Sequence, residues 1–299
     1  MDLKKIREVG NLELLARQMV EGFITGLHKS PYHGFSVEFA EHRLYNSGES
    51  TRHIDWKVYA KTDRLYTKRY EEETNLRGVI LLDHSPSMYY PAQDRGKLTF
   101  SCLAAASLAY LLNRQRDAVG LVTFAEGIET QTDIKSTHSH LHTLYAYLEK
   151  LLISEPSPTQ TNVSSVLHEV AEKIHKRSLV VLFSDMFEQS DSDQDILNAL
   201  RHLKHRKHEV LLFHVTDKKT EQDFSFEDRP YEFIDMETGE KVKLQPSQYR
   251  ETYIKEAKKH FEQLKLKCGQ FGIDFIEADI NEGVNQVLSS FLVKRTKMK

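Results

Sequence analysis

Short apolar runs alternate with longer amphipathic segments from residue 79 onward. Five of the runs are β-branched or leucine-rich and almost continuously apolar, which is typical of strands covered on both faces of a parallel sheet. They span residues 79–83, 119–124, 179–184, 209–215 and 273–277. Helices are expected at 97–114, 137–152, 162–176, 192–206, 246–272 and 283–294, and 126–132 could pair with strand 119–124. This alternation predicts an α/β fold: a doubly wound, mostly parallel sheet flanked by helices.

The first quarter of the chain has a different pattern. Apolar positions three or four residues apart predict an amphipathic helix over 11–27, and alternation over 65–71 predicts a strand with one wet face. We therefore expect an N-terminal helix and strand extension, residues 1–76, packed on a main domain, residues 77–299. Residues 217–245 look like an insertion in the main domain with a small hairpin.

Composition narrows the possible partners. Lys plus Arg total 41 against 44 Asp plus Glu, a net charge of −3, so neither nucleic acid nor an anionic membrane is expected as partner. Only Cys102 and Cys268 occur, without a paired motif, which favours a reduced, cytoplasmic compartment. No apolar stretch approaches the roughly 20 residues that span a bilayer, so no membrane insertion is expected.

Oxygen-bearing side chains follow two of the predicted strands. Strand 79–83 ends in Asp83, with Ser85 and Ser87 at alternate positions, and run 180–183 leads to Asp185. The carboxyl ends of parallel strands form the crevice in which such sheets bind ligands. Hydroxyl and carboxylate oxygens suit a hard divalent cation such as Mg²⁺. A loop with Thr161, just before a predicted helix, could complete the set.

Other interpretations of Asp83 stay open. Asp and Ser after a strand are commonly turn and N-cap residues, which would leave a metal-free scaffold of the same fold. A Mg²⁺-dependent phosphotransferase or phosphatase could use Asp83, but such enzymes need a second acid two residues on, where this chain has Ser85. Neither a Gly-x-Ser-x-Gly elbow nor a Gly-x-x-x-x-Gly-Lys loop occurs. We therefore expect a protein that is not an enzyme.

The run Asp-x-Ser-x-Ser-Met at 83–88 resembles the metal-ion-dependent adhesion site (MIDAS) of von Willebrand factor A domains. The resemblance implies a Rossmann-type von Willebrand factor A-like domain with one Mg²⁺, Mn²⁺ or Ca²⁺ ion, and a site that can stay empty without its partner. It implies these ligands: Asp83, Ser85, Ser87, Thr161 and Asp185. The open coordination position would take an Asp or Glu of a partner protein. One departure is Gln160, where relatives usually have glycine.

The N-terminal segment resembles the bacterial family called domain of unknown function 58. The resemblance rests on Gly-Glu-Ser-Thr-Arg-His-Ile-Asp-Trp at 48–56 and on the Tyr-Glu-Glu-Glu run at 70–73. Members are often linked to MoxR-type AAA+ ATPases, chaperone-like machines that act on other proteins. The resemblance thus implies a non-enzymatic, metal-dependent protein–protein interaction module, an adaptor or co-factor of such an ATPase.

Within that segment, Asp55 could pair with Arg52 or cap a short helix that runs to Ala60. Trp56 is most simply a core anchor that clamps the N-terminal segment to the sheet, and the alternative is a docking surface.

Histidines suggest a second chemistry. His138 and His142 lie on one face of a predicted helix, a geometry able to hold zinc. No cysteine or acid nearby in the sequence completes a zinc set, so a polar helix start is the simpler interpretation. His202, His205 and His208 lie at a basic helix end and are expected on a solvated surface.

Overall fold

The computed structural model describes residues 11–26, 39–45, 54–70, 76–92, 96–156, 162–186, 193–236 and 238–289 of the 299-residue chain. The chain divides into two compact units. One unit contains residues 27–75, and the other contains everything from Leu76 onward together with residues 1–26. The larger unit thus contains the N-terminal helix as well as everything from Leu76 onward.

A six-stranded sheet forms the larger unit, in the order β10-β7-β6-β3-β4-β5. Its strands are β3 (Arg77–Asp83), β4 (Ala118–Phe124), β5 (Ile128–Gln131), β6 (Leu179–Ser184), β7 (Glu209–Thr216) and β10 (Asp274–Asp279). All neighbouring pairs are parallel except β4 with β5. The predicted mostly parallel α/β sheet is confirmed, and so is the pairing of 126–132 with strand 119–124.

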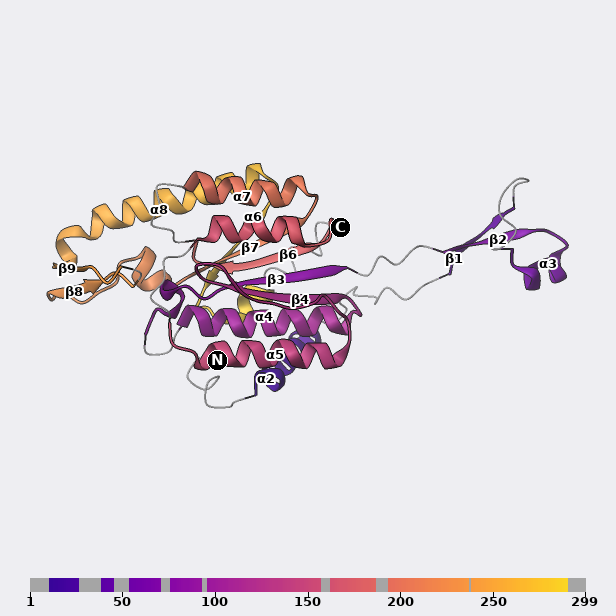
Figure 1. Ribbon diagram of the computed structural model, residues 1–299, viewed down its shortest axis with the longest axis horizontal. Helices are drawn as coiled ribbons and strands as arrows, with labels where there is room; N and C mark the ends of the chain where they lie inside the picture. Colours follow the sequence, from indigo (N-terminus) through magenta and orange to yellow (C-terminus); the bar gives the residue numbers. More distant parts are fainter. Residues whose placement is uncertain are drawn as a thin grey trace. The chain divides into compact units, whose positions relative to one another are not determined.

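Helices cover both faces of this sheet (Figure 1). They are α2 (Leu12–Gly26), α4 (Gly96–Arg114), α5 (His138–Ile153), α6 (Val163–Lys173), α7 (Asp193–His205) and α8 (Pro246–Gln270), with a last helical stretch at 284–289. Helices α2, α4 and α5 share one buried cluster with one face of the strands, and α6, α7 and the end of α8 share the other. None of the helices in the described ranges is long and apolar enough to cross a membrane.

Local sequence explains where these helices begin. Thr137 and Asn162 precede α5 and α6, and their side chains accept hydrogen bonds from the backbone N–H groups of His140 and Ser165. Helix α4 is apolar nearly all round, and it is buried over almost its whole length because α2 and α5 cover the side that faces away from the sheet.

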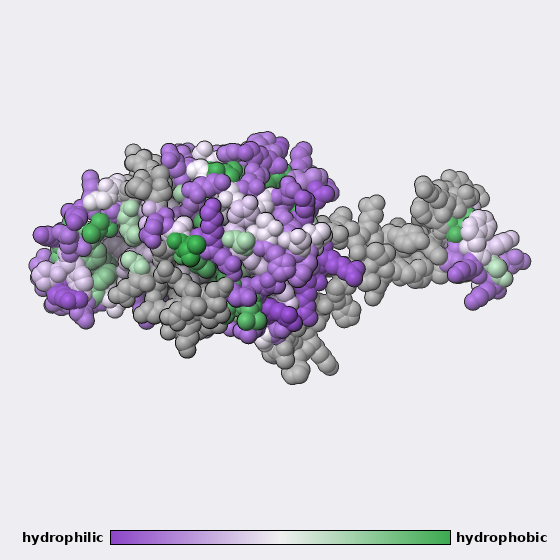
Figure 2. Space-filling model, turned by 60° about the horizontal axis from the view of Figure 1, so that its bottom comes forward, coloured by the Kyte–Doolittle hydropathy of each residue, from purple (hydrophilic) through white to green (hydrophobic). Residues whose placement is uncertain are grey.

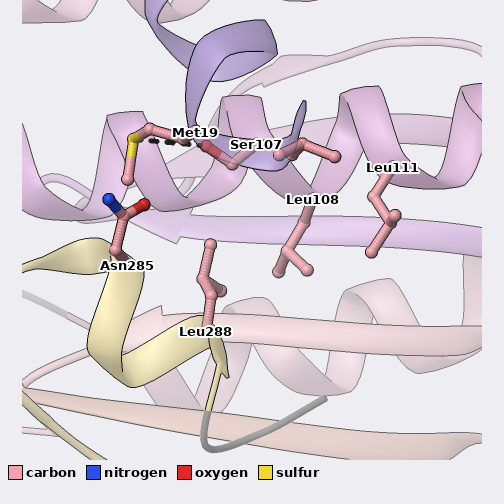
Figure 3. A pocket seen from close by; sticks show the side chains of 7 residues that line it. Met19, Ser107, Leu108, Leu111, Asn285 and Leu288 are labelled. Carbon is pink, nitrogen blue, oxygen red and sulfur yellow. Dashed lines mark hydrogen bonds between the residues drawn. The ribbon is translucent and has the colours of Figure 1, made fainter. Parts of the chain in front are cut away.

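Helix α2 packs on α4 through its apolar stripe, as its periodicity predicts. Leu12, Leu15 and Met19 are buried, and the Ser107 hydroxyl lies 3.8 Å from the Met19 sulfur. Figure 3 shows Met19 and Ser107 around a small cavity that Leu288 and Asn285 close from the last helical stretch. Its volume is about 20 Å³, room for a single water and too little for an organic ligand.

The expected insertion contains a π-helical turn, η3 (Lys218–Gln222), and a hairpin of β8 (Tyr231–Ile234) and β9 (Lys241–Leu244). Aromatic rings hold the hairpin side of this segment against α8. Phe224 stacks on Phe233, with ring centroids 5.8 Å apart, and its ring lies 4.4 Å from that of Tyr253 in α8. The insertion is therefore a packed element of the larger unit.

The smaller unit consists of β1 (Phe39–Leu44), α3 (Trp56–Thr62) and β2 (Tyr66–Tyr70), with β1 and β2 antiparallel. Asp55 caps α3, because its Oδ1 accepts hydrogen bonds from the backbone N–H groups of Lys57 and Val58. The capping role is confirmed, whereas Arg52 lies outside the described residues. Trp56 is 61% exposed, and its ring meets the edge of the Tyr59 ring, so it is not part of a core within this unit; the clamp to the sheet stays a prediction. Helix α3 has no buried residue against which an indole could pack.

The described surface in Figure 2 is mainly hydrophilic, and hydrophobic side chains appear there only as small separate patches. Such scattered patches are ordinary for a folded protein and do not by themselves indicate a docking surface.

Candidate functional site

The strand order reverses beside β3, the strand at the centre of the candidate site. The chain passes from β3 to β4 and β5 on one side, and then returns to β6, β7 and β10 on the other. Ligands of doubly wound sheets bind outside the carboxyl ends of the strands at such a switch point. Asp83 ends β3, and Asp185 follows the last residue of the neighbouring β6.

Asp83 is completely buried, and both of its carboxylate oxygens accept hydrogen bonds. The Ser85 backbone N–H donates to Oδ1 over 2.9 Å, and the Ser184 hydroxyl donates to Oδ2 over 2.7 Å. The Ser85 and Ser87 hydroxyl oxygens lie 3.1 Å apart. The tight turn after β3 therefore brings the three predicted oxygen donors together, with Ser184 as an additional contact that the sequence motif does not include.

A buried lysine reaches the same place from the first turn of α4. Lys97 is 2% exposed, and its Nζ lies 2.7 Å from Asp185 Oδ2 and 2.6 Å from Glu221 Oε1. Burial alone would lower the pKa of Lys97, but the charges of Asp185 and Glu221 outweigh it and hold that pKa above its ordinary value. Lys97 is therefore a permanent cation at the carboxyl edge.

We call Asp83, Lys97, Asp185 and Glu221 the carboxyl-edge cluster. Burial and the negative charge of Asp185 together raise the pKa of Asp83 to about 7, against the hydrogen bonds from Ser184 and Ser85, which lower it. Burial likewise raises the pKa of Glu221. The cluster contains three carboxylates and one ammonium, so its fully ionised state carries excess negative charge in a dry environment.

His214 of β7 adds a neutral group beside the cluster. Burial lowers its pKa to about 4, and its ring stacks on Phe275 with centroids 5.4 Å apart. Its Nδ1 has no hydrogen-bond partner among the described residues. An uncharged imidazole here leaves Lys97 as the cluster's source of positive charge.

Of the other residues in the predicted motifs, Met88 lies within the described part of the chain, and Thr161 and Gln160 do not. Met88 is fully buried in the short 3-10 helix η2 (Pro86–Tyr89), which turns the chain from β3 towards α4. Thr161 and Gln160 lie outside the described residues, so the threonine ligand stays a prediction.

Sequence reasoning missed two members of the cluster. Lys97 is a charged residue inside an apolar helical segment, which is a visible anomaly in the sequence. Glu221 lies 124 positions further on, in the insertion, and nothing local in the sequence links it to Lys97.

Among the described side chains, the donor set is compatible with a hard divalent cation. Asp83 and Asp185 offer carboxylates, and Ser85 and Ser87 offer hydroxyls, all from the two loops at the switch point. Such oxygen donors are those that Mg²⁺ and Ca²⁺ prefer. Lys97 supplies only one positive charge against three carboxylates, and a divalent ion would offset the negative charge that remains.

Comparison with known proteins places the chain in a family. The family model described as "Protein of unknown function DUF58" matches residues 41–263. Uncharacterized proteins of Mycobacterium tuberculosis and Mycobacterium bovis are 23% identical over 220 residues, which cover 73% of this chain and 67% of theirs.

Two solved structures are similar over most of the chain. The conserved hypothetical protein BatB from Bacteroides thetaiotaomicron has 15% identity and a TM-score of 0.43, and the match covers 74% of this chain and 99% of that one. An aerotolerance-related membrane protein from Bacteroides fragilis has 16% identity and a TM-score of 0.41, over 71% and 99% of the two chains. Because the family model matches well over half of its length, this chain belongs to the DUF58 family of proteins.

Proposed function

We propose that this protein is a metal-dependent protein-interaction module with a von Willebrand factor A-like domain. One Mg²⁺ ion binds at the carboxyl edge, and an Asp or Glu of a partner protein completes its coordination. The proposed ligands, which coordinate directly or through water, are Asp83, Ser85, Ser87, Thr161 and Asp185.

The observation that supports this proposal best is the charge of the carboxyl-edge cluster. Asp83 is buried, and its two oxygens accept hydrogen bonds from the Ser85 N–H and the Ser184 hydroxyl; among the described residues, no cationic side chain is hydrogen-bonded to it. Lys97 is directed to Asp185 and Glu221 instead. A buried carboxylate next to another one is costly unless a cation or a proton compensates it.

The arrangement favours binding over phosphoryl transfer. A nucleophilic aspartate needs an oxygen exposed to substrate, whereas Asp83 is inaccessible and hydrogen-bonded at both oxygens. The position where a general acid would follow is Ser85, a poor proton donor at neutral pH. Neutral hydroxyl donors also leave a bound cation electrophilic, so that it attracts a carboxylate from a partner.

The proposed partner is a MoxR-type AAA+ ATPase. This step rests on the resemblance to family members that are linked to such ATPases, and the chemistry of the site adds one requirement. The partner must present an exposed Asp or Glu that can reach the carboxyl edge of the sheet.

A metal-free scaffold is the second candidate, and Lys97 is the observation that favours it. Its ammonium already neutralises part of the negative charge and holds Asp185 at 2.7 Å. In that case the carboxyl-edge cluster would be a structural ion-pair network, and Mg²⁺ would have no measurable effect.

Calorimetric titration with Mg²⁺ separates these candidates. We expect one bound ion for the wild type and none for Asp83→Asn, which keeps the shape of the side chain. Asp133→Asn is the matched control, because Asp133 is an exposed aspartate paired with Lys135. Wild-type protein that shows no Mg²⁺ binding would favour the metal-free scaffold.

Affinity capture tests the partner. We expect a MoxR-type ATPase to be recovered with the wild type in Mg²⁺, and to be lost with a chelator or with Asp83→Asn. Equal recovery with and without chelator would refute the metal-dependent contact. Hydrolysis of phosphomonoesters by the wild type that disappears in Asp83→Asn would instead favour a phosphotransferase or phosphatase.

A further inference from the structure

Helices α2 and α5 bring together three side chains that can ligate a metal, at the end of the sheet opposite the carboxyl-edge cluster. His138 and His142 lie one turn apart on α5, with ring centroids 4.7 Å apart. Glu13 reaches them from α2, and its Oε2 lies 2.9 Å from His142 Nδ1. The ligand atoms of the three residues all lie within 4.8 Å of one another.

Glu13 supplies the acid that the sequence around the histidines lacks. It belongs to the first turn of α2, whereas the histidines belong to the first turn and a half of α5. An acid that is absent from the neighbouring sequence is thus supplied by a different helix. The packing of α2 beside α5, which the apolar pattern of α2 alone does not specify, creates the third ligand.

The chemistry of the three donors points to a borderline transition metal. Imidazole nitrogen with one carboxylate suits Zn²⁺, whereas Mg²⁺ and Ca²⁺ prefer oxygen donors only. Zn²⁺ binds nitrogen and oxygen at roughly 2.0–2.2 Å, which places tetrahedral ligand atoms about 3.4 Å from one another. His138 and His142 are exposed, so small side-chain rotations can close the present spacing to that value.

We propose that Glu13, His138 and His142 form a zinc site in which water takes the fourth coordination position. The ion ties α2 to the start of α5 and so fixes the N-terminal helix on the sheet-bearing unit. This site is independent of the proposed Mg²⁺ site, because it uses other residues and another class of metal.

The test is calorimetric titration of the full chain with Zn²⁺ in the presence of excess Mg²⁺, which occupies the oxygen-donor site. We expect one Zn²⁺ per chain, and no specific binding in the double variant His138→Gln/His142→Gln. In known metal sites, replacing a residue that only hydrogen-bonds to a ligand weakens metal binding roughly 10–100-fold. Replacing a ligand itself, as in Glu13→Gln, should therefore weaken zinc binding by about tenfold or more.

Two controls make the result specific. His140→Gln removes the third histidine of the same segment, whose Nε2 lies 3.1 Å from the Val119 carbonyl oxygen, and should leave zinc binding unchanged. His168→Gln/His202→Gln removes another exposed pair, whose Nδ1 atoms lie 3.0 Å apart between α6 and α7, and should also leave it unchanged. Co²⁺ in place of Zn²⁺ gives a visible spectrum that reports nitrogen coordination directly.

The proposal is overturned if the wild type binds no Zn²⁺, or if His138→Gln/His142→Gln binds it as tightly as the wild type. Undiminished binding in Glu13→Gln would remove the link between the helices, which is the structural core of the proposal. The thermal unfolding temperature without metal checks that each variant is folded.

Discussion

A few buried charged residues determine the net charge at the carboxyl edge of the sheet. The positions of Asp83 and Asp185 follow from the sequence, because Asp83 ends one apolar strand of a parallel sheet and Asp185 directly follows another. The position of Lys97 does not follow from it. Its two carboxylate partners lie 88 and 124 positions away, and only the folded chain brings them into contact.

Replacement of Lys97 by methionine should destabilise the protein by about 3–5 kcal/mol, because removal of one partner of a buried ion pair leaves uncompensated charge. Chemical denaturation without metal measures this loss. Added Mg²⁺ should recover part of it, since a divalent cation supplies the missing positive charge. Lys135→Met is the matched control: its ion pair with Asp133 is exposed, and its loss should cost less than about 1 kcal/mol. Similar losses for the two variants would contradict the role given to Lys97.

His208 shows a different limit of sequence reasoning at the residue scale. Its basic neighbourhood suggests a solvated surface, but the residue is 1% exposed, so that prediction is wrong. The chain turns after α7 and carries His208 beneath the start of β6 and β7, where its Nδ1 accepts a hydrogen bond from the Ser178 backbone N–H over 3.2 Å. Burial lowers the pKa of His208, and the nearby Arg206 charge lowers it further.

The buried His208 should make stability depend on pH. The unfolded chain takes up the proton more readily than the folded one, so the contribution of the neutral ring is complete above about pH 6.5 and is lost as the pH falls below that value. Urea unfolding measures the free energy of unfolding at pH 7.5 and 5.5. This free energy should fall less between the two pH values for His208→Asn than for the wild type, because asparagine keeps an acceptor for Ser178 but does not titrate. His205→Asn, at an exposed position of α7, should decline as much as the wild type. Equal declines for wild type and His208→Asn would refute this assignment.

Periodicity identifies elements at the scale of helices and strands, but it does not identify their partners. The spacing of Leu12, Leu15 and Met19 predicts the buried stripe of α2, and these residues are buried. That α4 and α5 receive the stripe depends on how they pack on the sheet, which no local pattern specifies. The zinc-ligand candidate Glu13 was missed for the same reason.

The docking of α2 can be tested at Met19, which is 7% exposed and borders the small cavity in Figure 3. Met19→Ala should destabilise the protein by about 2–4 kcal/mol, because it enlarges a cavity whose walls cannot fully collapse. Hydrogen exchange should become faster in α2 than in α4. Leu14→Ala, at a position of α2 that is 45% exposed, should cost much less. Equal losses would show that the stripe does not hold α2 in place.

In the larger unit, the direction of the strands places the two proposed metal sites at opposite edges of the sheet. The parallel strands all deliver their carboxyl ends, with Asp83 and Asp185, to one edge of the sheet. Helix α5 begins at the other edge, since β5 runs antiparallel to β4 and His140 contacts the carbonyl of Val119 near the start of β4. The oxygen donors of the proposed Mg²⁺ site therefore lie at the carboxyl edge, and His138 and His142 lie at the amino edge. Such a separation is a property of the topology, and neither motif alone reveals it.

Because opposite edges of the sheet carry the two proposed ions and share no ligand, their effects on stability should be additive. Each ion that binds only the folded chain contributes about 2.7 kcal/mol at a hundredfold excess over its dissociation constant. The free energy of unfolding with both ions should equal the sum of the separate increments to within about 0.5 kcal/mol, as for sites without common partners. Asp83→Asn should abolish only the Mg²⁺ increment, and His142→Gln only the Zn²⁺ increment. A shortfall well beyond that margin would mean that the ions compete for one site or that strain passes across the sheet. Loss of both increments in Asp83→Asn would exclude two independent sites, because the Glu13 site has no residue in common with the carboxyl-edge cluster.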